Sequence, residues 1–309
     1  MRTTAPTAPP GRDNAVRNYI LNGQSTIAPA LAGGLYLVAT PIGNLRDITV
    51  RALETLAAAD LIACEDTRVT HKLLERYGIA TALTPYHDHN AAQARPKLLA
   101  RLADGAAIAL VSDAGTPLIS DPGYKLVRAA REAGVSVTAL PGASAVLAAL
   151  TLAALPTDRF FFEGFLPAKE GQRRNRIAEL ARVPATLVLF ETGARIAAAL
   201  ADLAAGLGPR EAAICRELTK LHEEVRPGEL ATLARDYAGA DEPRGEIVIV
   251  VAPPVPQELS AGDLDDLLRQ ALTRLSVKEA VAEVTASTGQ SRREVYQRAL
   301  ALTKERGDD

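Results

Sequence analysis

Residues 106–123 read AAIALVSDAGTPLISDPG. The apolar run at 106–111 is short and uninterrupted, which is typical of a buried strand. It leads into a segment rich in Ser, Asp, Gly and Pro, residues that favour turns, and a helical pattern follows at 123–133. In open α/β sheets, ligands bind beyond the carboxyl ends of the strands. The stretch therefore predicts an α/β fold with a ligand-contacting loop at one edge of its sheet.

Strands and helices alternate along most of the chain. In the first half we expect further strands at 35–39, 60–64 and 135–140, and helices at 49–59, 67–77, 91–103 and 141–154. Strands that alternate with helices of about 10–15 residues favour a largely parallel sheet. After a seam at 155–158 the alternation resumes, with strands at 159–163, 186–190, 212–216 and 246–251 and helices at 172–181, 194–205 and 230–237.

The pattern divides the chain into a tail, two α/β domains and a helical appendage. Residues 1–32 are rich in Pro, Ala and Thr without a sustained period, so we expect a flexible N-terminal tail. The two α/β domains would cover 33–155 and 156–253. The segment 258–309 follows a Pro-rich linker, and its apolar residues recur at helical spacing. This appendage is compatible with a helix-turn-helix.

Composition excludes several classes of protein. Of the 309 residues, 48% are hydrophobic and 23% are charged, which is ordinary for a globular protein. The formal net charge of -2 gives no global basic character, so contact with RNA would need local patches. No apolar run approaches the roughly 18 residues of a membrane span, so we predict no membrane partner.

The cysteines and the N-terminal residues bear on the cellular compartment of the protein. Cys64 and Cys215 form no disulfide framework, which favours a cytoplasmic location. The first 20 residues lack an apolar signal core but carry Arg2, Arg12 and Arg17. An organellar transit peptide therefore stays open as an alternative to a flexible tail.

Common catalytic motifs are missing from the sequence. It has no GxxxxGK[ST] P-loop, no GxGxxG after the first strand, and no HExxH or CxxC motif. The segment GASAV at 142–146 lacks the last glycine of a nucleophile elbow. His87 and His89 have no further ligand candidate nearby, so we predict no metal site.

Turn-rich loops instead follow the predicted strands in both halves. Each loop alone is explained by ordinary turn chemistry, but their joint occurrence favours a ligand site. Their small residues would let a ligand approach backbone donors and acceptors. The loops are TPIGNLRD (40–47), CEDTR (64–68), SDAGTPLISDPG (112–123), PGASA (141–145), FETGAR (190–195), RELTK (216–220) and RGE (244–246).

These loops, together with LVATPIGNLRDIT at 37–49 and FEGFLP at 162–167, closely resemble the bacterial 16S ribosomal RNA cytidine 2′-O-methyltransferases of the tetrapyrrole methylase superfamily. The resemblance runs from about 35 to 251, and the helical appendage resembles the tail of the same group. It implies two α/β domains of the tetrapyrrole methylase type with an S-adenosylmethionine cleft between them, and a homodimer. The implied activity is methylation of the ribose 2′-hydroxyl of a cytidine in the decoding region of 16S rRNA in the small ribosomal subunit.

The resemblance also implies which residues contact the cofactor. Positions in the first half match loops that reach the amino-acid end of S-adenosylmethionine, and positions in the second half match those that close on its adenosine. The implied cofactor-binding residues are Pro41, Ser112, Asp113, Ala114, Gly115, Ile119, Ala143, Ser144, Phe190, Arg216, Gly245 and Ile247.

A ribose hydroxyl is a poor acid, so a carboxylate that accepts its proton would assist methyl transfer. The acids at the strand-end loops are Asp47, Glu65, Asp66 and Glu191. Our hypothesis assigns catalysis to Glu65 and Asp66 with Arg68 beside them, on loop position alone.

Local positive charge at 169–182 is the candidate RNA contact. Arg173, Arg174 and Arg176 stand there with few acids, next to the expected cleft rim. We expect them to bind phosphate, with a solvated helix face as the ordinary alternative. The appendage carries Arg292 and Arg293, but its acids cancel the charge overall.

Two other functions remain open. The first is a tetrapyrrole C-methyltransferase on the same fold, although the loop at 112–117 lacks the glycine-rich form typical of corrin and porphyrin enzymes. The second is a non-catalytic module that binds RNA or ribosomes, which would not need an intact cofactor cleft.

Overall fold

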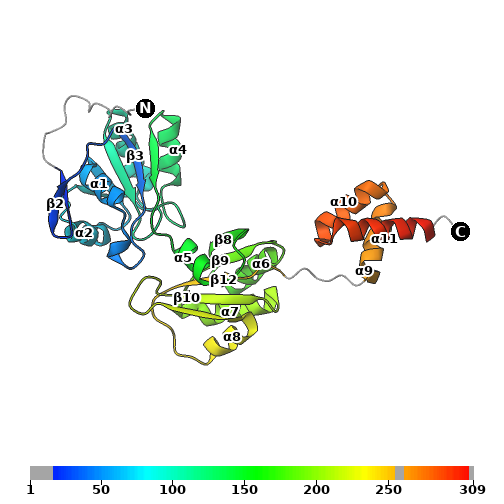
Figure 1. The fold of residues 1–309 in the computed structure, drawn as a ribbon. Helices are drawn as coiled ribbons and strands as arrows, with labels where there is room; N and C mark the ends of the chain where they lie inside the picture. The colour runs from blue at the N-terminus through cyan, green and yellow to red at the C-terminus, as the bar shows by residue number, and fades with distance from the viewer. Residues whose placement is uncertain (1–16, 255–260, 306–309) are drawn as a thin grey trace. The chain divides into compact units, whose positions relative to one another are not determined.

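The computed structural model describes residues 17–254 and 261–305 (Figure 1). The chain falls into two compact units, Met1–Pro253 and Pro254–Asp309. Within the described ranges, no helix is both long and apolar enough to cross a bilayer.

A β-hairpin precedes the first sheet. β1 (Asn18–Leu21) and β2 (Gln24–Ile27) pair antiparallel across Asn22 and Gly23, whose φ angles are 52° and 78°. Tyr19 is buried in the core beside helix α1. The predicted flexible tail is therefore wrong for residues 18–27, while 1–16 lie outside the described part of the chain. An Asn-Gly pair between two short strands is a strong hairpin signal, and the Pro-rich surroundings obscured it.

The first sheet is wholly parallel, with strand order β5-β4-β6-β3-β7. Its strands are β3 (Gly34–Val38), β4 (Leu61–Cys64), β5 (Leu83–Pro85), β6 (Ala107–Val111) and β7 (Val137–Leu140). Apolar residues on both faces are buried, as expected for a parallel sheet between helices. Helices α1 (Val50–Ala58) and α2 (Thr67–Arg76) cover one face, and α3 (Ala91–Ala103) and α4 (Tyr124–Glu132) cover the other (Figure 1).

The second sheet is mixed, with strand order β11-β10-β12-β9-β8. Its strands are β8 (Phe160–Phe165), β9 (Thr186–Thr192), β10 (Glu211–Arg216), β11 (Glu224–Glu229) and β12 (Glu246–Val251). Only β8 and β9 pair parallel, and the other neighbours are antiparallel. The short strand β5 and the polar strand β11 were absent from the sequence-based expectation. β11 reads EVRPGE, which has no apolar alternation because it lies at the edge of the sheet.

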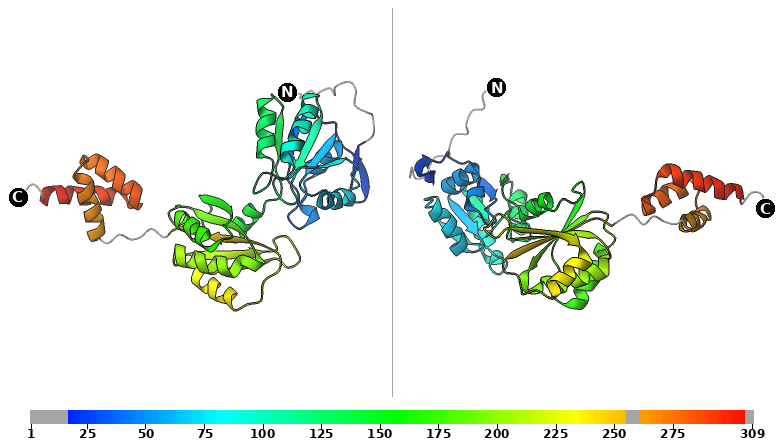
Figure 2. Two further views of the ribbon diagram at one scale, coloured as in Figure 1. Left: turned by 180° about the vertical axis from the view of Figure 1, so that it is seen from behind. Right: turned by 60° about the horizontal axis from the view of Figure 1, so that its bottom comes forward.

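Helices cover the two faces of this second sheet unequally (Figure 2). α6 (Glu170–Leu180), α7 (Gly193–Leu207) and α8 (Leu230–Ala238) share one core with alternate residues of β9, β10 and β12. The opposite face packs against α5 (Ala145–Leu152), which also follows the last strand of the first sheet. Helix α5 therefore links the two sheets next to their loops.

The second unit is a bundle of three helices in the described residues. α9 (Ala261–Leu272), α10 (Val277–Thr288) and α11 (Arg292–Glu305) enclose an apolar cluster of their own. Ser276 and Glu279 form a capping box at the start of α10, and Gly289 ends this helix in the left-handed conformation. The predicted helical appendage is confirmed for residues 261–305, with breaks between α9 and α10 and between α10 and α11.

Candidate functional site

Loops at the carboxyl edge of the first sheet are joined by hydrogen bonds. Thr40, after β3, and Gly115, after β6, exchange backbone N–H···O bonds of 2.9 Å in both directions. The backbone N–H of Asp66, after β4, donates to Oδ1 of Asp113 at 2.9 Å. These bonds fix three separate loops as one surface, as a preformed ligand site requires.

A cavity of about 430 Å³ opens against this surface, and we call it the first cavity. Loops of the second sheet form its other wall. Most of the predicted cofactor contacts line it: Asp113, Ala114, Gly115, Ile119, Ser144, Phe190, Gly245 and Ile247. Residues far apart in sequence thus meet at one site: they come from the loops after β6 and β7, the end of β9 and the start of β12.

Four predicted cofactor residues lie elsewhere. Pro41 and Ser112 line a neighbouring second cavity of about 340 Å³. Ala143 lines neither cavity, although its carbonyl accepts a hydrogen bond from Thr116 Oγ1 at 3.2 Å. Arg216 also lines neither, since its side chain pairs with Glu224 at 2.9 Å. The contact of Arg216 with the cofactor stays a prediction, and strand β11 supplies its side chain with a carboxylate partner that sequence reasoning had not placed.

An aromatic wall closes one side of the first cavity. Phe165 and Phe190 line it with ring centroids 5.6 Å apart and planes at 63°, and Phe162 lies 4.9 Å from Phe190 on the same side. Residues three apart on a regular strand point to opposite faces. A register shift between Phe162 and Gly164 brings both rings to Phe190. Phe165 was missed as a lining residue because only this bulge, marked in the sequence by Gly164, turns it toward the cavity.

Backbone strain is concentrated at the same rim. Four non-glycine residues of the strand-end loops have positive φ: Leu118 at 75°, Ser120 at 64°, Glu217 at 52° and Thr219 at 66°. Such residues cost free energy and cluster at binding sites. Gly245 has φ of 104°, and a Cβ there would stand 2.3 Å from Oε1 of Glu217. The loop after β10 therefore packs directly on the start of β12.

Buried carboxyl groups give the first cavity an acidic character. Burial raises the pKa of Asp121, with Asp113 adding to the rise and a hydrogen bond from Ser112 opposing it. Burial also raises the pKa of Glu191, a residue that is 2% exposed. The hydrogen bond from the Thr192 N–H and the charge of Arg195 oppose this rise. A site with such carboxyl groups favours a ligand that carries positive charge.

The predicted catalytic group is only partly supported by geometry. Asp66 caps helix α2, where its Oδ1 accepts from the Arg68 N–H at 2.8 Å, and its side chain pairs with the Arg68 guanidinium. The Arg68 side chain lowers the pKa of Asp66 to about 2, so this carboxylate is a weak base. Neither residue lines either cavity, and both are explained by helix capping. Glu65 also lines neither cavity, but burial and neighbouring carboxylates, first Asp113 and then Asp121, raise its pKa.

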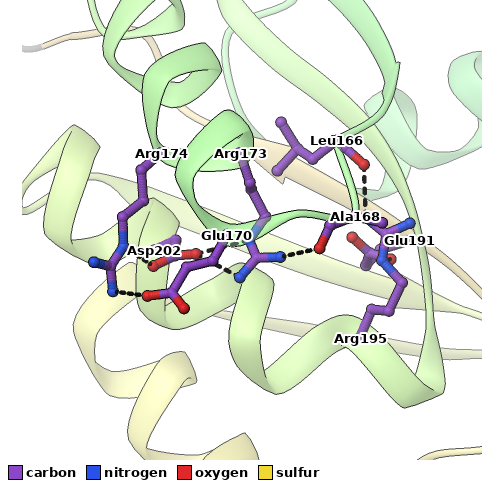
Figure 3. A network of polar contacts seen from close by, with 8 residues as sticks. All are labelled: Leu166, Ala168, Glu170, Arg173, Arg174, Glu191, Arg195 and Asp202. Carbon is purple, nitrogen blue, oxygen red and sulfur yellow. Dashed lines mark hydrogen bonds and ion pairs between the residues drawn. The ribbon is translucent and has the colours of Figure 1, made fainter.

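The predicted RNA contacts are occupied by internal ion pairs, and Figure 3 shows those of Arg173 and Arg174. Arg173 is 8% exposed and pairs with buried Asp202 at 2.7 Å, and its Nη1 donates to the Ala168 carbonyl at 3.2 Å. Arg174 also pairs with Asp202, at 2.8 Å. Arg176 pairs with Glu163 at 2.7 Å. The phosphate-binding prediction is wrong for Arg173, because burial removes it from any RNA, and the other two already have carboxylate partners.

The same network holds the segment that follows β8. Arg195 pairs with Glu191 at 3.2 Å and donates from Nη2 to the Leu166 carbonyl at 2.6 Å (Figure 3). Because Arg173 holds Ala168 in the same way, two guanidinium groups fix the backbone directly after Phe165. The network therefore supports the aromatic wall of the first cavity.

Comparisons with known proteins identify this arrangement. The family described as Tetrapyrrole (Corrin/Porphyrin) Methylases matches residues 34–234, and the RsmI C-terminal HTH domain matches residues 258–303. A protein of Mesorhizobium japonicum named Ribosomal RNA small subunit methyltransferase I is 52% identical over 288 residues, covering 93% of this chain and 98% of its own. A protein of the same name from Escherichia coli O157:H7 is 47% identical over 274 residues, covering 87% and 95%.

Solved structures share the fold at low identity. A diphthine synthase matches with a TM-score of 0.55 and 20% identity, covering 71% of this chain and 89% of its own. Uroporphyrin-III-C-methyltransferase from Thermus thermophilus matches with a TM-score of 0.51 and 21% identity, covering 71% and 94%. The predicted α/β fold of the tetrapyrrole methylase type with a C-terminal helical region is thus confirmed. The chain belongs to the ribosomal RNA small subunit methyltransferase I family, within the tetrapyrrole methylases.

Proposed function

We propose that this protein uses S-adenosylmethionine to methylate the ribose 2′-hydroxyl of a cytidine in the decoding region of 16S ribosomal RNA. The observation that carries the proposal is the first cavity, where loops of both sheets surround about 430 Å³. This volume is within the range of about 300–1,000 Å³ for small-molecule sites. The name of the relatives, Ribosomal RNA small subunit methyltransferase I, supports small-subunit rRNA as the substrate.

The lining of the first cavity fits the parts of S-adenosylmethionine. Phe165, Phe190 and Ile247 offer apolar surface to an adenine ring. Ser144 caps α5, so the positive end of this helix dipole faces the site and favours a carboxylate. Asp121, with its neighbour Asp113, suits the positively charged amino and sulfonium groups. When bound, the cofactor supplies an electrophilic methyl group, so the residues of this chain mainly align donor and acceptor.

Proton removal from the acceptor hydroxyl is the remaining chemical task. Asp121 lines the first cavity, and its raised pKa makes it a better proton acceptor than an exposed carboxylate. Glu65 has a raised pKa for the same reason and stands within electrostatic range of Asp121. Asp121→Asn and Glu65→Gln separate the two: the variant that removes the acceptor lowers kcat about 100-fold or more, measured at saturating S-adenosylmethionine because Asp121 also lines the cofactor cavity.

Two measurements test the proposed function. Isothermal titration calorimetry with S-adenosylmethionine tests the first cavity, and labelled methyl transfer to unmodified small subunits tests the acceptor. Binding together with transfer supports the proposal. Transfer to a corrin or porphyrin, with none to subunits or rRNA, would favour the tetrapyrrole C-methyltransferase instead.

We further propose that the enzyme acts as a homodimer, in the cytoplasm where its proposed substrate is assembled. Helix α5 and edge strand β8 carry exposed apolar side chains: Leu147 at 55%, Leu152 at 44%, Phe160 at 45% and Phe161 at 37%. Exposed apolar surface is typical of protein–protein contacts. Size-exclusion chromatography with light scattering should give the mass of two chains, and a monomer at micromolar concentration would contradict the dimer.

A further inference from the structure

The second cavity shares a wall with the first. Ile42, Asp113, Ala114 and Glu246 line both. Methyl transfer requires the acceptor oxygen and the methyl donor to be in contact and aligned. An acceptor must therefore bind in a space that opens onto the cofactor cavity, and the second cavity meets this condition. Another cavity of about 400 Å³, between β5 and α3, shares no residue with the first.

The remaining walls of the second cavity come from both sheets. Pro41 and Gly43 after β3 face Val69 and Lys72 of α2, and Lys220 closes the space from the loop after β10. Lys220 pairs with Glu217 at 2.6 Å and with Glu246 at 3.1 Å. It crosses Gly43 so closely that a Cβ on this glycine would stand 2.4 Å from Lys220 Cγ. The cavity is thus a built pocket with polar and apolar walls.

Basic side chains surround one edge of the second cavity, and we call Arg46, Lys72 and Arg76 the basic rim. The Tyr77 hydroxyl donates to the carbonyl of Leu45, a cavity-lining residue, at 2.6 Å. Arg76 and Arg46 both lie within electrostatic range of this hydroxyl, where they oppose the rise that burial causes in the Tyr77 pKa. Lys72 itself lines the cavity. The basic rim thus combines Lys72, which lines the cavity, with two arginines near the hydroxyl that is bonded to Leu45.

Unlike the arginines of α6, the side chains of the basic rim are available to bind phosphate. All three side chains are exposed, and within residues 17–254 and 261–305 none of them forms an ion pair with a carboxylate. The nearest acid on α2, Glu75, lies 4.0 Å from His71 instead. Exposed cations without carboxylate partners are the groups that bind the phosphates of nucleic acid.

We propose that the second cavity takes the acceptor nucleotide of a single-stranded RNA segment, with its ribose at the wall shared with the first cavity and the flanking phosphates on the basic rim. The proposal rests on the proposed function and names the site of its substrate. The proposed RNA contact therefore lies on α2 and the turn at Leu45–Asp47, and not on α6 where the sequence predicted it. Single-stranded RNA fits because its unstacked nucleotides can enter a pocket, whereas a duplex keeps its bases paired and stacked.

The basic rim is tested by the salt dependence of binding. For Lys72→Ala with Arg76→Ala, we expect affinity for unmodified small subunits to fall about tenfold at roughly 100 mM salt. The slope of log K against log[salt] should become shallower by about 1.4, since each phosphate contact with single strands contributes about 0.7. Cofactor affinity should change less than twofold. The matched control is Lys125→Ala with Arg131→Ala, two exposed cations of α4 outside both cavities.

The second cavity itself is tested by filling it. Val69 is 39% exposed and lines the second cavity but not the first. Val69→Trp should keep cofactor binding and lose methyl transfer by more than 100-fold, while Val50→Trp on α1 should retain transfer. Unchanged RNA affinity and salt slope in the double variant, or normal transfer by Val69→Trp, would overturn the proposal. A wild-type protein that methylates no rRNA would instead contradict the proposed function, and the binding measurements separate the two.

Discussion

The guanidinium of Arg173 lies 2.7 Å from Oδ2 of Asp202, and both side chains are buried. This pair joins α6 to α7, and Arg173 also holds the carbonyl of Ala168. Arg173, which we predicted to bind phosphate from its sequence context, thus stabilises the packing of α6 on α7. Its contribution to function is indirect, through the backbone that follows Phe165.

Breaking this pair should destabilise the fold. Arg173→Ala leaves the Asp202 carboxylate buried beside a single remaining arginine, and loss of one partner of a buried pair costs about 3–5 kcal/mol. Arg174→Ala should cost less than about 1 kcal/mol, because the Arg174 side chain is 63% exposed. Urea denaturation measures both. Equal midpoints for the two variants would show that burial of Arg173 contributes nothing to stability.

Removing the Phe165 ring should weaken cofactor binding without unfolding the protein. The side chain is 51% exposed and lines the first cavity against Phe190. An aromatic contact of this kind is worth about 0.5–1.5 kcal/mol, so Phe165→Ala should raise the Kd for S-adenosylmethionine by up to about tenfold. Calorimetry measures the change, with Tyr296→Ala on α11 as an aromatic control. An unchanged Kd would remove Phe165 from the cofactor site.

The Asp66–Arg68 pair should stabilise the fold at neutral pH and lose this effect in acid. The pKa of Asp66 is lowered from 3.8 to about 2, first by the hydrogen bond from the Arg68 side chain. The folded chain therefore favours the carboxylate: the pair stabilises above pH 3.8, and this stabilisation is lost as the pH falls toward 2.

Arg68→Ala tests whether this pair is structural. The pKa of Asp66, followed by carboxyl NMR, should rise toward its ordinary value, while the backbone cap keeps part of the shift. Methyl transfer at neutral pH should stay within a few-fold of wild type, because neither residue lines a cavity. A loss of transfer of 100-fold or more with normal folding would restore the catalytic hypothesis for this pair.

The C-terminal unit should be separable from cofactor binding. Its helices have their own apolar cluster, and none of its described residues, 254 and 261–305, lines the first cavity. A chain that ends at Pro253 should therefore bind S-adenosylmethionine with the Kd of the full chain. Calorimetry on both forms measures this, and a lost or strongly weakened signal in a folded truncated chain would contradict it.

Much of the fold is predictable because buried parallel strands have a plain signature. The apolar runs that become β4 and β6 are buried on both faces, and the loops after them carry the turn residues that a ligand site uses. Shared position after strands also brought Asp113 and Ser144 to one cavity, and Gly245 joins them from the start of β12, which lies beside the end of the antiparallel strand β9. Topology rules alone account for that meeting.

The sequence-based predictions fail where contacts between residues far apart in the sequence determine the position of a side chain. Asp202 stands 29 residues beyond Arg173, so no local pattern shows that this arginine is neutralised. A single bulge residue determines on which face Phe165 lies. The partner of Arg216 comes from an edge strand without apolar alternation. Each of these three features depends on tertiary contacts, which the spacing of residues along the sequence does not show.

The most direct test of the central claim is methyl transfer from labelled S-adenosylmethionine to unmodified small ribosomal subunits, mapped by mass spectrometry of nuclease fragments. The account predicts one 2′-O-methylcytidine in the decoding region of 16S rRNA, absent when Val69→Trp replaces the wild-type chain. A methyl group on a base, or no transfer to subunits or free rRNA by a protein that binds the cofactor, would contradict it.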